Sequence, residues 1–237
     1  MNAVGIIPAR YGSARFPGKP LADINGKTMI QRVYEQAKMS RSLSGVFVAT
    51  DDERIIAEVD GFGGNALMTS TAHRSGTDRC YEALEKIGKD KYAVVVNIQG
   101  DEPFIHPEQI DRVVTCFTNK KVQIATLAHR LTNTDDLNNP NIVKIVRNIH
   151  GEALYFSRSV IPYSLSLTPH SYLKHIGIYA FRPEVLERVV KLPVSPLEKA
   201  ESLEQLRWLE NGYPIMVEIT DKESFPVDTP EDIKKFL

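Results

Sequence analysis

Three basic side chains follow the first apolar segment of the chain and could bind a polyphosphate. Arg10, Arg15 and Lys19 lie within the segment Arg10–Pro20, which also contains two glycines and two prolines. A polyphosphate requires cations, backbone N–H groups and a chain that can approach closely, and glycine permits that approach. The position of the loop after a buried strand favours a phosphate site over its alternative, a solvated basic turn.

Two glycine-containing segments come close to known nucleotide-binding motifs without matching them. In a Walker A loop four residues separate the glycines and a Ser or Thr binds magnesium, whereas here five residues separate Gly12 from Gly18 and Pro20 takes the later position. The segment Gly61–Ala66 matches G-x-G-x-x-A, the dinucleotide fingerprint. It follows a predicted helix and precedes a predicted strand, which is the reverse of the required context, so we interpret it as a tight turn.

Two carboxylates lie where a metal ion bound to a nucleotide would need them. Asp101 lies in the segment Gln99–Pro103 at the end of Tyr92–Ile98, the strongest strand signal in the chain, and Asp228 precedes Pro230 near the C-terminus. Magnesium binds one or two carboxylates together with phosphate and water oxygens, so both residues are candidate ligands. The alternatives are that Asp101 forms a turn or cap, and that Asp228 or Thr229 caps a last helix that begins at Pro230.

The first half of the chain alternates between strand and helix patterns, which predicts a parallel α/β sheet with right-handed crossovers. Ligands bind at the carboxyl ends of such strands, where the basic loop and Asp101 both lie. Thr28 is placed to cap the first helix, whose apolar face includes Met29 and Val33. The predicted strands are 3–7, 46–49, 65–68 and 92–98, and the predicted helices are 29–37, 52–59 and 77–87.

The second half contains more strands and fewer helices, which indicates a partly antiparallel extension of the sheet. A helix is predicted over 197–208, with leucines at 203, 206 and 209. No repeat, low-complexity tract or linker-like composition interrupts the sequence, so we predict one domain, 1–237. The strands predicted in this half are 123–129, 142–146, 153–156, 173–181 and 213–219.

Composition is typical of a globular protein, with 42% hydrophobic and 25% charged residues. The net charge of −1 gives no general attraction to nucleic acid or to anionic membranes, so we expect neither as a partner. Cys80 and Cys116 are far apart and lack metal-binding spacing, so we interpret them as reduced, buried residues. No signal-peptide pattern and no apolar run of membrane-spanning length is present, which predicts a cytoplasmic protein.

Taken in order, the motifs of this chain resemble those of the 3-deoxy-manno-octulosonate (Kdo) cytidylyltransferases, the CMP-Kdo synthetases of lipopolysaccharide synthesis. The resemblance extends from the first ten residues to the last ten, and it is the ordered set of motifs that is specific. The matching segments are Ile6–Tyr11, Arg15, Pro17–Leu21, Ala49–Asp51, Ser75–Arg79, Asn97–Pro103, Ala153–Arg158, His175–Tyr179, Ser195–Glu198, Leu203–Arg207 and Val227–Asp232.

The resemblance implies a Rossmann-like nucleotide-diphospho-sugar transferase fold, with a mixed, mostly parallel central sheet flanked by helices, and a homodimer. It also assigns site residues, with Lys19, Arg15, Asp101 and Asp228 as the catalytic set. Arg10, Ser13, Arg15 and Lys19 would hold the phosphates of CTP, and Ser75, Gly76, Thr77 and Gln99 would surround the nucleoside. Asp101 and Asp228 would bind Mg²⁺, and Arg79, Arg158, His175, Tyr179, Glu204 and Gln205 would surround the sugar acid.

The sugar-site residues also have simpler interpretations. His175 and Tyr179 lie on one face of a predicted strand and could be interior residues. Glu204 and Gln205 could form an exposed helix face, and Arg158 could pair with a neighbouring acid.

The implied reaction transfers CMP from CTP to the anomeric hydroxyl of Kdo or of its 8-amino analogue and releases pyrophosphate. Positioning and charge stabilisation would carry the catalysis, without a covalent enzyme intermediate. The alternatives are a nucleotidyltransferase for another sugar acid and a silent CTP-binding regulator. Two features depart from the family pattern: the segment Tyr163–Tyr172 is short, and Arg74 adds a cation before Ser75.

Overall fold

The computed structural model describes residues 1–12, 16–133, 135–163 and 172–234. Its contacts divide the chain into two compact units, which are described separately below. Unit 1 combines residues 1–111 with 224–237, so it is made from both ends of the chain. Unit 2 is the continuous stretch 112–223 between them.

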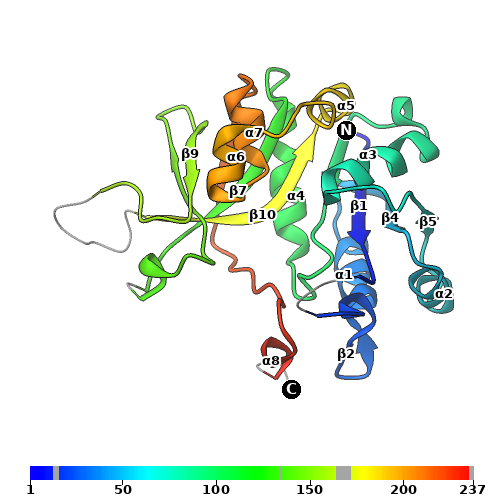
Figure 1. Ribbon diagram of the computed structural model, residues 1–237. Coiled ribbons are helices and arrows are strands. Elements are labelled where there is room, and N and C mark those ends of the chain that lie inside the picture. The colour runs from blue at the N-terminus through cyan, green and yellow to red at the C-terminus, as the bar shows by residue number, and fades with distance from the viewer. Residues whose placement is uncertain (13–15, 134, 164–171, 235–237) are drawn as a thin grey trace. The chain divides into compact units, whose positions relative to one another are not determined.

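Four parallel strands form the sheet of unit 1, in the order β6-β1-β4-β5. Figure 1 labels β1, β4 and β5. They are β1 (Ala3–Ala9), β4 (Leu43–Thr50), β5 (Ala66–Met68) and β6 (Val94–Asn97). Every residue of β6 is buried, and β1 is buried except at one position, as expected for strands that are covered on both faces. The predicted parallel α/β arrangement of the first half is confirmed.

Helices α1 (Met29–Lys38), α2 (Glu53–Gly61) and α3 (Gly76–Ile87) connect these strands and pack against them. The predicted cap of α1 is confirmed, because the Thr28 hydroxyl accepts a hydrogen bond from the Gln31 N–H at 3.3 Å. Because each helix follows a strand, its N-terminus begins near the carboxyl edge of the sheet, where the basic loop also lies.

The C-terminal segment returns to unit 1 and packs beside an N-terminal hairpin (Figure 1). The hairpin consists of β2 (Asp23–Ile24) and β3 (Lys27–Thr28), and the segment ends in the short helix α8 (Pro230–Ile233). Ile24 and Ile233 share one hydrophobic cluster with Met29, Val227 and partly buried neighbours. This cluster holds the last described residues of the chain against the first third of unit 1.

Unit 2 contains both parallel and antiparallel strand pairs. Strand β7 (Ile124–Arg130) pairs in parallel with β11 (Ile215–Thr220) and antiparallel with β10 (Leu173–Phe181). Strand β8 (Lys144–Arg147) pairs antiparallel with both β10 and β9 (Ala153–Ser157). The antiparallel character predicted for the second half is confirmed, and so is the α/β class with mostly parallel strands and flanking helices.

The prediction of one helix over 197–208 is wrong, because the structure has two helices there. Helix α6 (Pro196–Glu201) ends at Ser202, whose φ of 52° is left-handed, and α7 (Gln205–Glu210) begins three residues later. Leucine spacing alone does not reveal a left-handed serine.

Helices α4 (Pro107–Thr115) and α5 (Pro183–Val189) were not predicted, although each begins with a proline suited to a first turn.

Both cysteines are free thiols, as predicted, with Cys80 buried and Cys116 half-buried. Burial raises the pKa of the Cys116 thiol to about 11, and Glu218 adds to the effect, so this thiol is a weak nucleophile.

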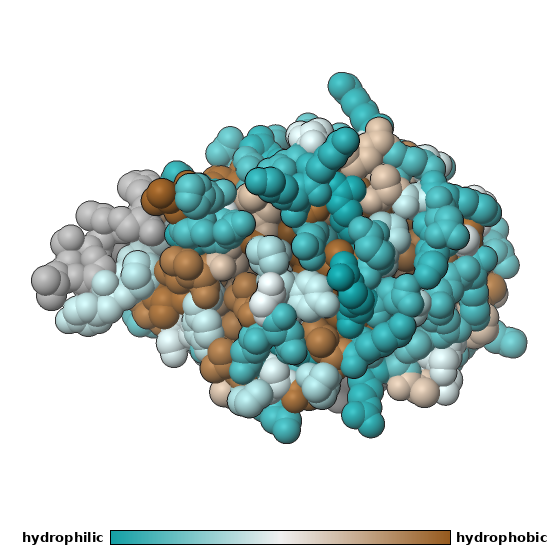
Figure 2. Space-filling model, turned by 90° about the horizontal axis from the view of Figure 1, so that it is seen from above, coloured by the Kyte–Doolittle hydropathy of each residue, from teal (hydrophilic) through white to brown (hydrophobic). Residues whose placement is uncertain are grey.

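Hydrophilic side chains cover most of the face seen in Figure 2. Within the described ranges, every helix is too short or too polar to cross a membrane.

Candidate active site

Three segments of unit 1 meet at the carboxyl ends of β1 and β6, and two glycines permit the approach. A Cβ atom at position 100 would lie 2.8 Å from the carbonyl oxygen of Pro8. A Cβ at position 76 would lie 3.1 Å from the Pro8 ring. Both positions therefore favour glycine, which lets the loop after β6 and the start of α3 contact the end of β1.

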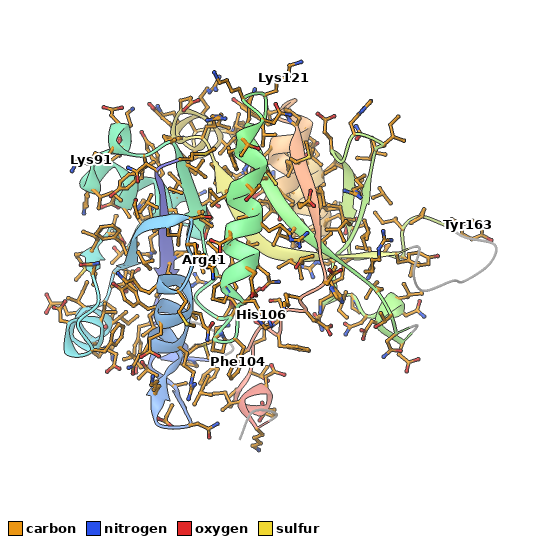
Figure 3. All side chains as sticks on the ribbon, turned by 180° about the vertical axis from the view of Figure 1, so that it is seen from behind. Arg41, Lys91, Phe104, His106, Lys121 and Tyr163 are labelled. Atoms are coloured by element: carbon orange, nitrogen blue, oxygen red, sulfur yellow. The ribbon has the colours of Figure 1, made fainter. Side chains whose placement is uncertain are left out.

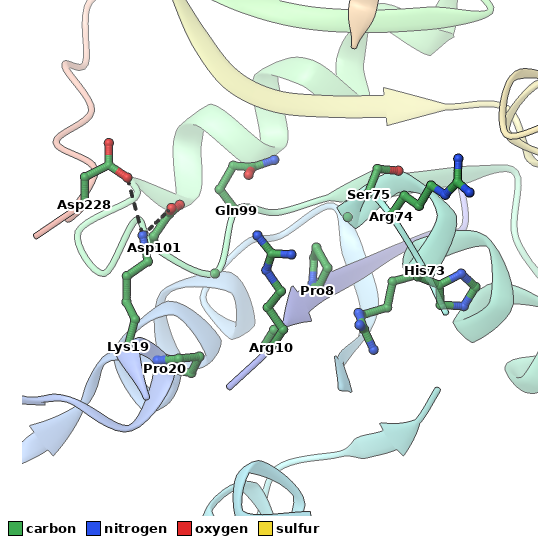
Figure 4. Close-up of a pocket in the computed structure, with 14 residues that line it drawn as sticks. Pro8, Arg10, Lys19, Pro20, His73, Arg74, Ser75, Gln99, Asp101 and Asp228 are labelled. Atoms are coloured by element: carbon green, nitrogen blue, oxygen red, sulfur yellow. Dashed lines mark hydrogen bonds and ion pairs between the residues drawn. The ribbon is translucent and has the colours of Figure 1, made fainter. Parts of the chain in front are cut away.

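A pocket of about 270 Å³ lies at this junction (Figure 4). It is polar and rich in basic residues, and it brings together most of the described residues that were predicted to contact phosphate, nucleoside and metal. Its lining consists of Pro8, Ala9, Arg10, Lys19, Pro20, His73, Arg74, Ser75, Gly76, Arg79, Gln99, Gly100, Asp101 and Asp228.

The basic loop is closed at its base by a backbone hydrogen bond. The Gly18 N–H donates to the Tyr11 carbonyl at 2.9 Å, and Gly18 has a φ of 73°, which a glycine adopts without strain. The Arg54 guanidinium stacks on the Tyr11 ring at 3.3 Å from its centroid. Arg10 and Lys19, which flank this closure, both line the pocket. The predicted residues Ser13 and Arg15 lie outside the described residues.

The two predicted metal carboxylates lie at one end of the pocket and share a lysine (Figure 4). The Lys19 ammonium lies 2.7 Å from Asp101 Oδ2 and 3.6 Å from Asp228 Oδ1. It also donates to the Val227 carbonyl at 2.7 Å. The carboxylates are 29% and 40% exposed, so they remain accessible to a ligand in the pocket.

The C-terminal loop shows which residue caps the last helix, the alternative interpretation of Asp228. Thr229 is the N-cap residue of α8, and its N–H and hydroxyl donate to the Asp232 carboxylate, each at 3.0 Å. The side chain of Asp228 is therefore not needed as the cap, and it faces Lys19 instead. Thr229 therefore caps the helix, whereas the neighbouring Asp228 directs its carboxylate toward Lys19.

The other end of the pocket is formed by the start of α3. Ser75 caps this 12-residue helix through a reciprocal pair of hydrogen bonds with Asp78, at 3.1 and 3.2 Å. Ser75, Gly76 and Gln99 line the pocket as predicted for nucleoside contacts. Thr77 is buried, with 3% exposure, and it is absent from the described lining.

His73 and Arg74 also line the pocket, although the sequence did not identify His73 as a site residue. His73 Nε2 contacts the Glu82 carboxylate, which also accepts hydrogen bonds from Lys86 and from the Ser70 N–H. Burial raises the pKa of Glu82, but these donors outweigh it and lower the value to about 2. Among the described residues, Arg10 and Arg74 have no ion-pair partner, so both cations are available to an anion in the pocket.

Arg79 lines the same pocket, but its guanidinium is held by the protein. It donates to the Asp51 carboxylate at 2.7 Å and to the Thr69 hydroxyl at 2.6 Å, and the residue is 4% exposed. Through these two bonds, Arg79 connects α3 with the segments that follow β4 and β5. The structure thus places Arg79 beside the predicted nucleoside residues and gives it a clear structural function.

Two of the predicted sugar residues form part of an aromatic cluster in unit 2. The rings of His175 and Tyr179 lie 5.3 Å apart, and Tyr179 packs edge-to-face on Trp208 at 5.0 Å. Burial lowers the pKa of His175 to about 3, so its imidazole is neutral at physiological pH. His175 Nε2 lies 3.1 Å from the Thr126 hydroxyl, which in turn lies 2.7 Å from the Ile178 carbonyl.

The remaining predicted sugar residues differ in their surroundings. Gln205 is 6% exposed, and Glu204 lies 3.7 Å from Arg207, so an exposed helix face does not describe this pair. The Arg158 guanidinium donates to the carbonyls of Glu201 and Pro140, at 2.8 and 2.9 Å. The guanidinium of Arg158 thus contacts carbonyl oxygens. The contact of Arg158 with an acid is made by its backbone N–H, which donates to the Glu201 carboxylate at 2.9 Å.

The arrangement in unit 1 suits a bound nucleotide and its metal ion. Magnesium takes one or two carboxylates and completes its shell with phosphate and water oxygens, and Asp101 with Asp228 provides such a pair. The described part of the chain contains no group of three or more Asp, Glu, His or Cys side chains that could hold a metal ion by themselves. The donor set therefore fits a metal that arrives with, or is completed by, a polyphosphate.

Comparison with known proteins identifies the class. The model of the cytidylyltransferase family matches residues 4–223, so the chain belongs to the cytidylyltransferases and is an enzyme of that kind. Members of this family typically use a divalent metal ion. A basic pocket with a pair of carboxylates suits such an enzyme.

Individual relatives refine this assignment. The chain is 59% identical to a 3-deoxy-manno-octulosonate cytidylyltransferase of Parabacteroides distasonis, with 100% of this chain and 97% of the relative covered. It is 47% identical to an 8-amino-3,8-dideoxy-manno-octulosonate cytidylyltransferase of Shewanella putrefaciens, with 99% and 97% covered. A solved structure of CMP-2-keto-3-deoxy-manno-octonic acid synthetase in complex with CTP aligns with a TM-score of 0.93 at 45% identity, with 99% and 96% covered. The family and the fold that the motifs predicted are thereby confirmed.

Proposed function

We propose that this enzyme transfers CMP from CTP to the anomeric hydroxyl of 3-deoxy-manno-octulosonate, or of its 8-amino analogue, and releases pyrophosphate for lipopolysaccharide synthesis. The observation that carries the proposal is the carboxylate pair of Asp101 and Asp228 beside Lys19 in a basic pocket. High identity over whole chains to relatives named for this reaction supports the choice of substrates.

In the proposed reaction the anomeric oxygen bonds to the α-phosphorus of CTP, and the bond from that phosphorus to the bridging oxygen breaks. Pyrophosphate leaves with the bridging oxygen, and the hydroxyl proton is lost to water. This chemistry needs positioning and charge stabilisation more than covalent help from the protein. A silent CTP-binding regulator would have no need for both carboxylates.

The polar residues predicted from the sequence have distinct roles in this scheme. Arg10 and Lys19 bind the phosphates, and Lys19 offsets negative charge that develops on the departing pyrophosphate. Ser75 and Gly76, at the start of α3, present backbone groups to the nucleoside beside Gln99. The predicted phosphate contacts of Ser13 and Arg15 belong to the same proposal.

We assign the metal as Mg²⁺, held by Asp101 and Asp228. When bound, the ion would supply positive charge that offsets charge on the reacting phosphates, and it would lower the pKa of the attacking hydroxyl. The lysine that both carboxylates share keeps them on the same side of the pocket. Both carboxylates carry exposed surface, which a metal ligand in an open site requires.

The sugar-binding roles of Arg79, Arg158, His175, Tyr179, Glu204 and Gln205 stay predictions. For His175 the structure restricts the kind of contact. Because burial keeps its imidazole neutral, it would recognise the sugar through a hydrogen bond rather than as a cation.

We also propose that the enzyme acts as a homodimer in the cytoplasm, where CTP is available. Light scattering that gives the mass of one chain would refute the dimer.

The test is pyrophosphate release with CTP and magnesium, comparing Kdo, its 8-amino analogue and sialic acid as acceptors. Release with either octulosonate is the expected result, and the ratio of the two rates identifies the preferred sugar. Release with sialic acid alone would replace the substrate by another sugar acid. CTP binding without release for any acceptor would support the silent regulator and contradict the proposal.

A further inference from the structure

The two proposed metal-site carboxylates come from the two separate stretches of chain that make up unit 1. Asp101 lies in the loop after β6, and Asp228 lies in the C-terminal segment before α8. Neither loop has a regular ladder to the other, so their relative position depends on specific contacts between the two segments. A small shift of one carboxylate would change how the pair holds a metal, since magnesium tolerates little deviation from its preferred geometry.

One set of contacts fixes the segment around Val227. The Val227 N–H donates to the Asp101 carbonyl at 2.9 Å, and the Val227 carbonyl accepts from Lys19 at 2.7 Å. The Val227 side chain is fully buried in the cluster with Ile24, and Phe104 packs against the same cluster. In Figure 3, Phe104 lies near His106, the residue that directly precedes α4. Backbone and apolar contacts thus hold the segment next to the loop.

A second contact joins the same two segments through side chains. The Ser224 hydroxyl donates to Glu102 Oε2 at 2.5 Å, across 122 positions of sequence. Ser224 is 3% exposed and Glu102 is 5% exposed, so water competes little with this bond. Neither residue lines the pocket, so neither would touch the substrates.

The placement of the bond relative to the carboxylates suggests its function. Glu102 immediately follows Asp101, and Ser224 precedes Asp228 within a segment that has no helix or strand. The bond therefore ties the backbone beside one carboxylate to the segment that carries the other. We propose that Glu102 and Ser224 are positioning residues that set the separation of Asp101 and Asp228 for metal binding. This inference rests on the proposed metal role of the two aspartates.

A purely structural bond would behave differently from a positioning bond. Loss of any buried serine–carboxylate hydrogen bond leaves an acceptor unsatisfied and lowers stability. Only a positioning bond would also weaken metal binding in protein that remains folded. The chain offers a matched control, since the Ser40 hydroxyl donates to the Asp111 carboxylate at 2.6 Å, Ser40 is 7% exposed, and neither residue lines the pocket.

The experiment compares Ser224→Ala with Ser40→Ala in the full chain. Mn²⁺ binding in the presence of a non-hydrolysable CTP analogue is followed by electron paramagnetic resonance, without sugar and without turnover. The Mg²⁺ concentration for half-maximal pyrophosphate release and the thermal unfolding midpoint are measured in parallel. We expect Ser224→Ala to weaken Mn²⁺ binding and raise the Mg²⁺ requirement by about tenfold, the scale of one lost buried hydrogen bond to a charged group.

Both serine variants should unfold at lower temperature, but Ser40→Ala should bind Mn²⁺ like the unaltered enzyme. Ser224→Thr, which keeps the hydroxyl, should retain metal binding to within about threefold of the unaltered enzyme. Glu102→Asp, whose shorter side chain withdraws the carboxylate, should resemble Ser224→Ala, and it carries the test if Ser224→Ala does not fold.

Unchanged Mn²⁺ binding in folded Ser224→Ala, or an equal loss in Ser40→Ala, would overturn the inference. Asp228→Asn separates this failure from failure of the metal assignment itself. Impaired Mn²⁺ binding in Asp228→Asn with normal binding in Ser224→Ala would leave the metal site in place and remove only the positioning role. Normal binding in Asp228→Asn would remove the metal assignment and the inference with it.

Discussion

At the scale of single residues, Lys19 is the charge that connects the two halves of the site. It contacts both carboxylates and the Val227 carbonyl, and it also lines the pocket that would receive the phosphates. A lysine carries three donors, so it can hold carboxylates and phosphate oxygens together. Asp101, Asp228 and Lys19 are therefore expected to lose their proposed functions together when one of them is removed.

We predict that Asp101→Asn abolishes turnover while the protein stays folded. The amide keeps the shape of the side chain but removes the charge that holds both the metal and Lys19, so the rate should fall by about 10³-fold or more. Pyrophosphate release measures the loss, and circular dichroism checks the fold. Asp90→Asn, an exposed position outside the pocket lining, serves as the control. A near-normal rate for Asp101→Asn would refute the metal assignment.

His175 should make stability depend on pH in a defined direction. Burial lowers its pKa from 6.5 to about 3, so the folded protein leaves it neutral while the unfolded chain binds a proton below pH 6.5. Its contribution is complete above pH 6.5 and is lost progressively as the pH falls toward 3. The stability difference between the unaltered protein and His175→Gln, from urea unfolding, should therefore shrink between pH 7 and pH 4. A constant difference over this range would contradict the buried neutral state.

At the scale of elements, the site depends on how closely the ends of β1, β6 and α3 approach. Gly100 and Gly76 both lie against Pro8, at the end of β1. Strand order alone brings these ends to one edge of the sheet, but the contact distances require residues without a side chain. The glycines thus convert a general property of parallel sheets into a particular pocket.

We predict that Gly100→Ala damages the site more than the fold around it. The new methyl group would meet the Pro8 carbonyl at 2.8 Å, so the Asp101 loop must shift, at a cost of about 1–3 kcal/mol. The rate of pyrophosphate release should fall by at least about tenfold, since catalytic groups misplaced by about 1 Å lose that much or more. Gly61→Ala at the end of α2 meets no atom within 4 Å and should be neutral or slightly stabilising. Equal activity of the two variants would argue against the close approach.

At the scale of the whole molecule, the chain leaves unit 1 and returns to it. Residues 1–111 and 224–237 form one compact unit, and residues 112–223 form the other. Asp228 belongs to the returning part, so unit 1 has its full carboxylate pair only when both ends of the chain are folded together. The prediction of a single domain concerns whether these units also unfold together.

Calorimetry tests this prediction directly. If residues 1–237 form one cooperative domain, thermal unfolding should show one transition whose calorimetric and van't Hoff enthalpies agree. A variant truncated after Glu223 should then lower the midpoint of that single transition, because Val227 and Ile233 leave a buried cluster. Two separate transitions, of which only one responds to the truncation, would show that the units fold independently.

Much of this protein could be predicted from local patterns. The period of the apolar residues indicated the parallel sheet, and Thr28 indicated the start of α1, because both signals depend on neighbouring residues alone. Arg10, Lys19 and Asp101 were singled out because chemically suitable side chains follow predicted strands, and Asp228 because it lies in an acidic loop before Pro230. The break between α6 and α7 was missed, since the left-handed Ser202 has no signature in leucine spacing.

The sequence by itself determined the fold class, the family and the residue types that the site requires. The tertiary structure decided which of those residues meet: that Lys19 contacts both carboxylates, that Arg79 is held by Asp51, and that Glu102 bonds Ser224. The physical reason is that propensity and periodicity act within a few residues. Contacts between residues from 28 to more than a hundred positions apart are fixed by packing, burial and hydrogen-bond geometry that arise only in the folded chain.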